Sequence, residues 1–427
     1  MLSIIKADGT AEQQALALLR SRSGEVDRKV TAVVTEIIET VRREGDAALK
    51  QYAERFDGAA PAALEVPKAQ IQQALAAADA DFVLALRRAQ ENITAFHARQ
   101  KQQSFLDPQP NGVILGQRVR GLHRVGLYVP GGTAAYPSSV LMNAVPAKIA
   151  GVGELIMVTP PGKDGSANPD ILAAAAIAGV DRVFLTGGAQ AVAALAYGTE
   201  SIPRVDKIVG PGNIYVATAK KLLYGQVDID MIAGPSEILV VADETADPRY
   251  LAADLMSQAE HDRLASAILL CTDEAVAHQT IAEIERQSQG LSRREIIAQA
   301  LENFGAVIVC QDFEQMVALA NEIAPEHLEV MTKSPLESVG RFDNAGSVFL
   351  GRYSPEPLGD YFAGPNHVLP TSGTARFFSP LSVDSFVKRS SFIYYTEDAL
   401  RNAAKDIVII AEKEGLTAHA NAITVRF

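Results

Sequence analysis

The chain has 427 residues, of which 48% are hydrophobic and 21% are charged. This composition is typical of a soluble globular protein and excludes general disorder, and the length predicts two or more domains. Lys and Arg number 39 against 51 Asp and Glu, which gives a net charge of -12. Because an acidic surface repels polyphosphate, nucleic acid is excluded as the main partner, and a small substrate that bears positive charge is favoured.

The distribution of apolar residues predicts a protein without a membrane partner. No segment offers the roughly 20 apolar residues that a membrane span needs, and the alanine-rich run 171–178 is too short. The first residues also lack a charged leader followed by a long apolar stretch. Cys271 and Cys310 lie within apolar runs, so we interpret both as buried strand residues and expect neither a disulfide nor a reactive thiol. These features together predict a cytoplasmic location.

The spacing of apolar residues predicts helices in the first part of the chain, in a short segment at 11–21 and then from 26 to about 102. Beyond Pro108, short β-branched runs alternate with helical ones. The predicted strands lie within 154–161, 181–188, 206–213, 236–243, 266–271 and 306–310, and a tail helix covers 397–414. Apolar strands that alternate with helices predict parallel sheets covered on both faces. About nine such strands exceed one small sheet, so we divide them between two α/β units.

Several predicted strands end in glycine-rich turns, which is a pattern of nucleotide-binding proteins. Neither G-x-G-x-x-G nor G-x-x-x-x-G-K-[ST] occurs in the chain. The turn G-G-A-Q at 187–190 still presents backbone N–H groups at a helix start, where phosphate can bind. The alternative, that glycine serves only to reverse the chain direction, remains open.

Two polar pairs are candidates for chemistry. Gln258 and His261 are three residues apart at the end of an amphipathic helix and therefore share a face. His is a common metal ligand and Gln an unusual one, and a helix end that meets water is the alternative. Glu326 and His327 come where a helix ends and a strand begins, outside a strand end, where catalytic side chains of α/β folds often lie. Such an acid–base pair can move two protons near neutral pH, although solvated charges in an exposed turn would have the same sequence.

Two further segments carry polar residues outside regular elements. The loop at 356–370 is rich in Gly and Pro and contains Asp360 and His367, and long irregular loops in compact proteins are usually functional. Glu414 and His419 lie at and just past the end of the tail helix, where a histidine is normally a surface residue.

The chain resembles the histidinol dehydrogenase family over essentially its whole length. The matching segments are G-L-Y-V-P-G-G-T-A-A-Y-P-S-S-V-L-M-N-A-V-P-A, G-G-A-Q-A-V-A-A-L-A-Y-G-T, D-K-I-V-G-P-G-N, A-G-P-S-E-I-L-V-V-A-D, D-L-M-S-Q-A-E-H, A-P-E-H-L-E and P-E-P-L-G-D-Y-F-A-G-P-N-H-V-L-P-T-S-G-T-A-R-F. So many long matches in one order exclude chance. The family also lacks a complete dinucleotide fingerprint, which accounts for the missing G-x-G-x-x-G.

The resemblance implies an α/β fold of two incomplete Rossmann-like domains with parallel sheets flanked by helices, plus small N- and C-terminal segments. The expected parts are an N-terminal helical segment 1–22, a catalytic domain 23–127 with 235–378, an NAD-binding domain 128–234 and a C-terminal tail 379–427. It further implies a homodimer in which the tail contributes to the active site of the partner.

The activity implied by the resemblance is the four-electron oxidation of L-histidinol to L-histidine through histidinal, with two NAD+, as the last step of histidine biosynthesis. Glu326 and His327 match the catalytic pair of the family, and Tyr128, Gln190 and Asn213 match its NAD contacts. One Zn2+ per subunit is implied, with the ligands Gln258, His261, Asp360 and His419. The implied substrate contacts are Ser236, Gln258, His261, His327, Asp360, Glu414 and His419.

These roles imply a mechanism and leave alternatives. His327 would take the alcohol proton, Glu326 would deprotonate the water that hydrates the aldehyde, and zinc would hold the imidazole and amino nitrogens of the substrate. Glu414 would pair with the substrate ammonium group. The alternatives are the same scaffold acting on another small alcohol such as a sulfonated diol, a zinc hydrolase, and a non-catalytic zinc- or nucleotide-binding protein.

Overall fold

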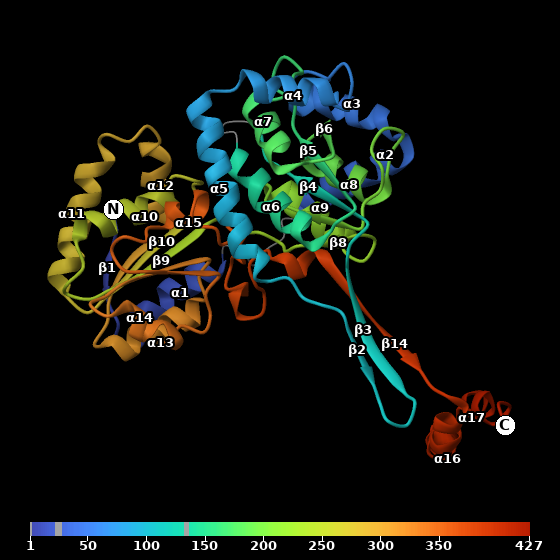
Figure 1. Ribbon diagram of the computed structural model, residues 1–427. Coiled ribbons are helices and arrows are strands. Elements are labelled where there is room, and N and C mark those ends of the chain that lie inside the picture. Colours follow the sequence, from blue (N-terminus) through green and yellow to red (C-terminus); the bar gives the residue numbers. More distant parts are fainter. Residues whose placement is uncertain (1, 22–27, 132–135) are drawn as a thin grey trace.

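The computed structural model describes residues 2–21, 28–131 and 136–427. Two bodies, each built around a parallel sheet, lie side by side, and an arm that ends in two helices projects from one of them (Figure 1). Within the described ranges, no helix is both long enough and apolar enough to cross a membrane.

The larger sheet has six strands, all parallel, in the order β1-β11-β10-β9-β12-β13. The strands are β1 (Ile4–Lys6), β9 (Glu237–Ala242), β10 (Ser266–Cys271), β11 (Gly305–Val309), β12 (His327–Met331) and β13 (Ser347–Leu350). One face packs against α10 (Pro248–Ala259), α11 (Glu274–Ser288) and α12 (Arg294–Phe304), and the other against α1 (Ala11–Ser21) and α13 (Phe313–Ile323). Short turns of helix follow β12, namely α14 (Pro335–Ser338) and η1 (Val339–Arg341).

The smaller sheet has five parallel strands in the order β6-β5-β4-β7-β8. They are β4 (Arg124–Tyr128), β5 (Glu154–Thr159), β6 (Arg182–Leu185), β7 (Lys207–Val209) and β8 (Asp228–Ile229). One face is covered by α4 (Lys68–Ala77), α5 (Ala80–Ala98), α6 (Pro137–Ala150) and α7 (Pro169–Ala178), the other by α2 (Arg28–Glu44), α3 (Asp46–Phe56), α8 (Gly188–Tyr197) and α9 (Ile214–Leu223). The strand order reverses between β4 and β7, which makes this the place where a ligand crevice is expected in an open α/β sheet.

The division of the chain differs from the expected one in two places. The helices α2 to α5 pack against the smaller sheet, and β4 already begins at Arg124, whereas we had grouped 23–127 with 235–378. A helical pattern alone does not reveal which sheet a helix covers, and this explains the difference. The first segment also contributes a strand, β1, to the edge of the larger sheet, and three residues are too few to show a sequence period. The expected boundary at 22 lies outside the described residues.

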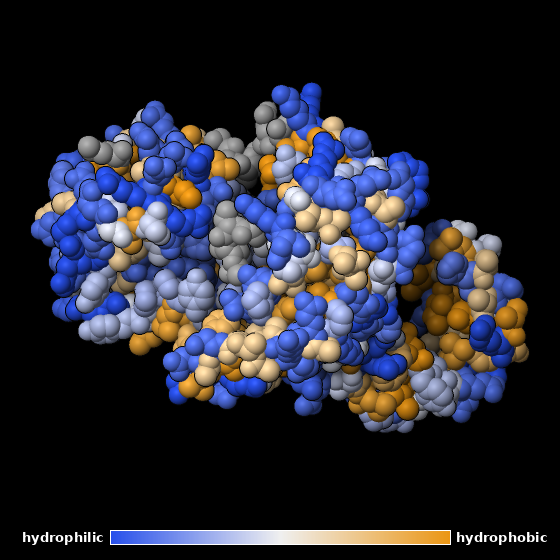
Figure 2. Space-filling model, turned by 90° about the horizontal axis from the view of Figure 1, so that it is seen from above, coloured by the Kyte–Doolittle hydropathy of each residue, from blue (hydrophilic) through white to orange (hydrophobic). Residues whose placement is uncertain are grey.

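The arm is a three-stranded antiparallel sheet in the order β14-β3-β2, followed by two helices. Its elements are β2 (Phe105–Pro108), β3 (Ile114–Gly121), β14 (Val387–Tyr394), α16 (Glu397–Lys413) and α17 (Thr417–Thr424). Figure 1 places α16 and α17 at the end of the arm, away from both parallel sheets. Large apolar side chains are exposed there, and Figure 2 shows hydrophobic surface over this projecting part at the right.

A loop joins the two bodies across the cleft between them. It contains α15 (Glu356–Tyr361), η2 (Thr374–Arg376) and η3 (Val383–Phe386). In this loop, His367 Nε2 lies 3.3 Å from the hydroxyl of Ser139, at the start of α6 and therefore past the carboxyl end of β4. Asp360 Oδ1 in the same loop lies 3.7 Å from Nε2 of His327, at the start of β12. The carboxyl edge of the smaller sheet therefore faces the amino edge of the larger one.

Candidate active site

Glu326 and His327 lie in the middle of the larger sheet, at the start of β12. The preceding helix α13 ends at Ala324, whose φ of 51° turns the chain, and Pro325 then leads into the strand. β12 is hydrogen-bonded between β9 and β13, with His327 opposite Ile238 and Ser347. The predicted junction of helix and strand is thus present, and both side chains are buried. It lies at the amino end of the strand, so the rule that places sites at carboxyl ends does not apply to this sheet.

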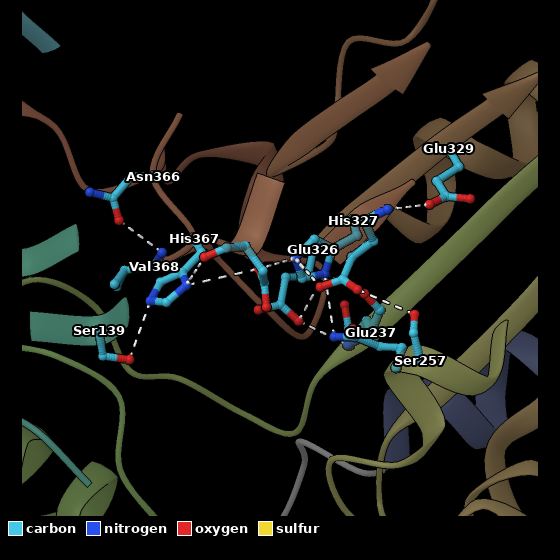
Figure 3. Close-up of polar contacts among 12 residues, drawn as sticks. Ser139, Glu237, Ser257, Glu326, His327, Glu329, Asn366, His367 and Val368 are labelled. Atoms are coloured by element: carbon cyan, nitrogen blue, oxygen red, sulfur yellow. Dashed lines mark hydrogen bonds and ion pairs between the residues drawn. The ribbon is translucent and has the colours of Figure 1, made fainter. Parts of the chain in front are cut away.

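Hydrogen bonds orient the imidazole of His327 (Figure 3). Its Nδ1 donates to the backbone oxygen of Glu237 at 2.9 Å, because a carbonyl can only accept. Nε2 is then the basic nitrogen and faces Asp360 Oδ1 at 3.7 Å and Glu356 Oε1 at 3.9 Å. Glu326 Oε2 accepts from the backbone N–H of Glu237 at 2.8 Å and lies 3.6 Å from His327 Nδ1. One ring nitrogen is therefore fixed by the fold, and the other, which is buried, faces the carboxylates of Asp360 and Glu356.

Burial sets the acid–base properties of this pair. Burial raises the pKa of Glu326 to about 8, against the opposing effect of the His327 ring. Burial alone would lower the pKa of His327, but the carboxylates of Glu326 and Asp360 outweigh it and raise the value to about 10. Asp360 is half-buried, which favours a higher pKa, yet its interaction with His327 keeps its pKa below the ordinary value. Two groups with raised pKa values in contact are typical of a site that transfers protons.

Three of the four predicted metal ligands gather around His327. Gln258 in α10 is 1% exposed, its Nε2 lies 3.4 Å from His327 Nδ1, and its Oε1 has no hydrogen-bond partner among the described residues. His261 follows the end of α10, where its N–H donates to Gln258 O at 3.2 Å. Burial lowers the pKa of His261, opposed by the charge of Asp360. An imidazole, a carboxylate and an unpartnered buried amide oxygen form a donor set that fits a cation such as zinc.

A fourth side chain, Glu356, also belongs to this cluster and was not predicted. Single ligand atoms of His327, Glu356 and Asp360 lie within 4.8 Å of one another, an arrangement that could hold a metal ion. Glu356 Oε2 accepts from Ser257 Oγ at 3.2 Å, and burial, together with the like charge of Asp360, raises its pKa to about 8. The available signal was its spacing, because Glu356 and Asp360 are one helical turn apart in α15.

Ser236 lies at the edge of the cluster, and Glu414 and His419 do not lie in it. Ser236 directly precedes β9, and its backbone oxygen accepts from Ser266 N–H at 3.0 Å. Glu414 caps α16 and His419 lies in α17, both exposed, at the end of the arm (Figure 1). Within one chain, the structure therefore does not bring Glu414 and His419 to the other site residues.

The three residues expected to contact NAD occupy the carboxyl edge of the smaller sheet. Tyr128 ends β4, and its hydroxyl accepts from the N–H of Gly188 at 3.0 Å, while burial raises its pKa to about 12. Gln190 is buried in the first turn of α8. Asn213 caps α9 and its side chain accepts from Tyr215 N–H at 3.0 Å. These residues flank the point where the strand order reverses.

One glycine shows why the turn after β7 can approach this edge so closely. Gly210 has a φ of +109°, and a Cβ atom there would lie 2.1 Å from the backbone oxygen of Tyr128. Only glycine allows the two chains to pass at this distance. Part of the other glycine turn, which follows β4, lies outside the described residues.

An apolar cavity of about 410 Å³ adjoins the cluster. Side chains of α5 and α6, among them Leu86 and Leu141, form much of its wall. His261 and Arg293 contribute polar groups to its lining. A cavity of this size and mixed lining is suited to a small molecule or a short segment of chain.

Two opposed parallel sheets, one with glycine turns at its switch point and one with a buried acid–base pair, define an α/β enzyme of the dinucleotide-dependent oxidoreductase class. The sequence comparisons specify the family. A family model described as histidinol dehydrogenase matches residues 20–427. Histidinol dehydrogenase from Clostridium acetobutylicum is 56% identical over 427 residues, covering 100% of this chain and 99% of that protein. The Listeria innocua enzyme of the same name is 55% identical over 419 residues, 98% of each chain.

A solved structure agrees with these sequence comparisons. The crystal structure of histidinol dehydrogenase from Elizabethkingia anophelis superimposes with a TM-score of 0.92 at 38% identity, covering 99% of this chain and 97% of that one. The chain therefore belongs to the histidinol dehydrogenase family, an NAD-linked oxidoreductase family. The predicted fold class is confirmed, and the sulfonated-diol, hydrolase and non-catalytic alternatives find no support.

Proposed function

We propose that this chain oxidises L-histidinol to L-histidine through histidinal, as the last step of histidine biosynthesis, with two NAD+ as hydride acceptors. The observation that carries the proposal is the buried Glu326–His327 pair, which faces Asp360 and Gln258 in a chain of this family. The substrate is a small amino alcohol with a cationic ammonium group, and the carboxylates of the cluster suit its charge. We further propose that the enzyme acts in the cytoplasm.

His327 is the base of the first oxidation. Its Nε2 takes the hydroxyl proton of the alcohol while a hydride leaves the same carbon for nicotinamide, which gives the aldehyde, NADH and a proton. The fold supports this role because Nδ1 donates to the carbonyl of Glu237, while Nε2 has no hydrogen-bond partner among the described residues and faces Asp360. A cation bound to Asp360 would offset the charge of that carboxylate. The pKa of His327 would then be lower, and the imidazole would be closer to its neutral, basic form.

Glu326 is the base of the second oxidation. It takes a proton from the water that adds to the aldehyde, and the resulting gem-diol loses a second hydride to give the carboxylic acid. Its pKa of about 8 makes it a stronger base than an ordinary carboxylate once it is ionised. A thiol route has no support, since burial raises the pKa values of Cys271 and Cys310 to about 11 and 12.

Gln258, His261 and Asp360 would hold one zinc ion per subunit, together with His419 of the partner subunit. The unpartnered Oε1 of Gln258 and the charge on Asp360 support this set. When bound, zinc supplies a template for the imidazole and amino nitrogens of the substrate. Ser236 and Glu414 would complete the substrate contacts, with Glu414 pairing with the ammonium group.

The chain would act as a homodimer in which each tail, 379–427, completes the site of the other subunit. Two features of the arm support this. His419 and Glu414 lie far from the remaining site residues of their own chain (Figure 1). Apolar side chains on the arm are exposed, such as Ile393 at 73% and Ile410 at 60%, and a second copy would bury them. Tyr128, Gln190 and Asn213 would contact NAD at the switch point of the smaller sheet.

The proposal is tested by the number of NADH molecules formed for each histidinol consumed, measured with and without a chelator. We expect a ratio of about two, consistent with a four-electron oxidation, and loss of activity in the chelator that added zinc restores. A ratio of about one would limit the enzyme to the alcohol step, and full activity in the metal-free protein would remove zinc from the mechanism.

A further inference from the structure

Three acidic side chains lie buried in or beside the cluster, and the mechanism above gives none of them a task. Asp254 in α10 is 7% exposed, Glu329 in β12 is 0% exposed, and Glu356 at the start of α15 is 2% exposed. Buried carboxyl groups are costly unless each is hydrogen-bonded or paired. Their presence under a reactive site therefore requires a structural or chemical reason.

The alternation of β12 directs Glu329 to the same face of the sheet as His327. Side chains two residues apart on a strand share a face, and this face packs against α10. Leu328 and Val330 point to the other face, where they pack against α13. Glu329 thus lies directly beneath His327, between the strand and the helix that carries Gln258, and Figure 3 shows it on one side of the His327–Glu326 pair.

Glu329 bonds to both of the elements that bring ligands to His327. Its Oε1 accepts from the backbone N–H of Glu356 at 2.7 Å, and Glu356 is the first residue of α15. Its carboxyl group also interacts with the carboxyl group of Asp254 in α10. Two carboxyl groups form a hydrogen bond only when one of them is protonated, so we infer that this pair shares one proton.

Asp254 and Glu356, the two residues that Glu329 contacts, each lie one helical turn before a proposed metal ligand. Asp254 is four residues, about one turn, before Gln258 in α10. Glu356 is four residues before Asp360 in α15. Fixing one residue of a helical turn fixes the side chain one turn further along the same face. Ser257 adds a contact between the two helices, because its hydroxyl donates to the backbone oxygen of Asp254 at 2.8 Å and lies 3.2 Å from Glu356 Oε2.

We propose that Glu329 and Asp254 are positioning residues, which hold α10 and α15 against β12 so that Gln258 and Asp360 face His327 and bind the metal. The inference rests on the proposed ligand set but concerns side chains that touch neither metal nor substrate. Outer hydrogen bonds of this kind orient metal ligands, and their removal typically costs about 10- to 100-fold in metal affinity.

The test compares two substitutions at the same position. Glu329→Gln keeps both bonds, because the amide donates to Asp254 and its oxygen accepts from Glu356 N–H. Glu329→Leu has a similar volume and removes both. Zinc affinity is measured by competition with a chelator, in the absence of histidinol and NAD+. We expect Glu329→Gln to stay within about threefold of the wild type and Glu329→Leu to bind zinc at least about tenfold more weakly.

Val330→Ala is the matched control for lost stability. Val330 neighbours Glu329 and is fully buried, but it packs on the opposite face of β12. The cavity left by this substitution lowers the melting temperature without touching the bonds to α10 and α15. We expect Val330→Ala to keep wild-type zinc affinity. Should Glu329→Leu not fold, Asp254→Ala against Asp254→Asn makes the same comparison from the helix side.

Each outcome decides between the proposals. Wild-type zinc affinity in folded Glu329→Leu, or equal loss in Glu329→Gln and Glu329→Leu, overturns the positioning role. A wild type that turns over no histidinol, while the zinc affinities follow the expected pattern, overturns the proposed substrate and leaves the positioning role in place. A wild type that binds no zinc contradicts both.

Discussion

The proposed dependence of each active site on the partner's tail can be tested with two inactive variants. His327→Asn removes the base from the body of the chain, and His419→Asn removes a proposed ligand from the tail. In the structure His419 lies in α17, beyond an arm strand of eight residues, which spans about 26 Å. A histidine so placed serves another subunit more readily than its own.

The size of the effect follows from counting sites. In a heterodimer, one site combines the intact His327 of one chain with the intact His419 of the other, and the second site carries both defects. With equal mixing, half the dimers are heterodimers and half of their sites work. About a quarter of wild-type activity should therefore return. If the tail served its own chain, every site would keep one defect and no activity would return.

The assay is the rate of NADH formation after the two variants are mixed under conditions that exchange subunits. Exchange is verified independently, by following tagged chains into mixed dimers. The matched control mixes His327→Asn with His261→Asn, two defects that both lie in the body. No heterodimer site is then complete, so this mixture should stay inactive. An inactive His327→Asn and His419→Asn mixture with proven exchange would refute the shared site.

Three further substitutions have defined outcomes. His261→Asn should lower the zinc content of the folded, purified protein to less than about half of the wild-type value, and full occupancy would remove His261 from the ligand set. Glu326→Gln should slow the oxidation of supplied histidinal about 100-fold while slowing the alcohol step much less, because only the aldehyde step needs an activated water; equal slowing would make Glu326 a positioning residue. Asp57 is a half-buried carboxyl group, and burial raises its pKa from 3.8 to about 6. Its contribution to the stability of the fold is therefore fully present below pH 3.8 and is lost as the pH rises through about 6. Asp57→Asn should therefore raise the free energy of unfolding at pH 7.5 by about 1 kcal/mol, after allowance for solvent screening, and with it the melting temperature, and should leave both unchanged at pH 3.5.

Local sequence patterns were sufficient to predict the strands that are buried on both faces. The segments at 155–158 and 267–271 are unbroken apolar runs, and both lie in fully or almost fully buried strands of the structure. Such runs are long enough, and end sharply enough at Gly, Pro or polar residues, to specify a parallel sheet under helices. The Glu326–His327 junction was found for the same reason, since the apolar helix before it and the apolar strand after it define its position.

The arm could not be predicted in the same way. The strands β2, β3 and β14 are largely exposed on both faces, so their sequences show no continuous apolar run and only a weak alternation. Their pairing also joins residues far apart in the chain, such as Gly121 with Val387. What holds these strands together is antiparallel hydrogen bonding, which leaves little trace in composition.

The assembly of the cluster is a tertiary effect, and it explains why some of its members were missed. Gln258 and His261 share a helix end, and Glu326 and His327 are adjacent, so each pair was visible in the sequence. Glu356 joins the cluster only because α15 folds back against β12, where its backbone N–H donates to Glu329. The loop of Asp360 also sets the amino edge of the larger sheet opposite the carboxyl edge of the smaller one. This opposition also has a chemical use. We propose that a dinucleotide bound at the carboxyl edge, where helix starts present N–H groups, meets a substrate bound at the amino edge, where carboxylates and an imidazole converge.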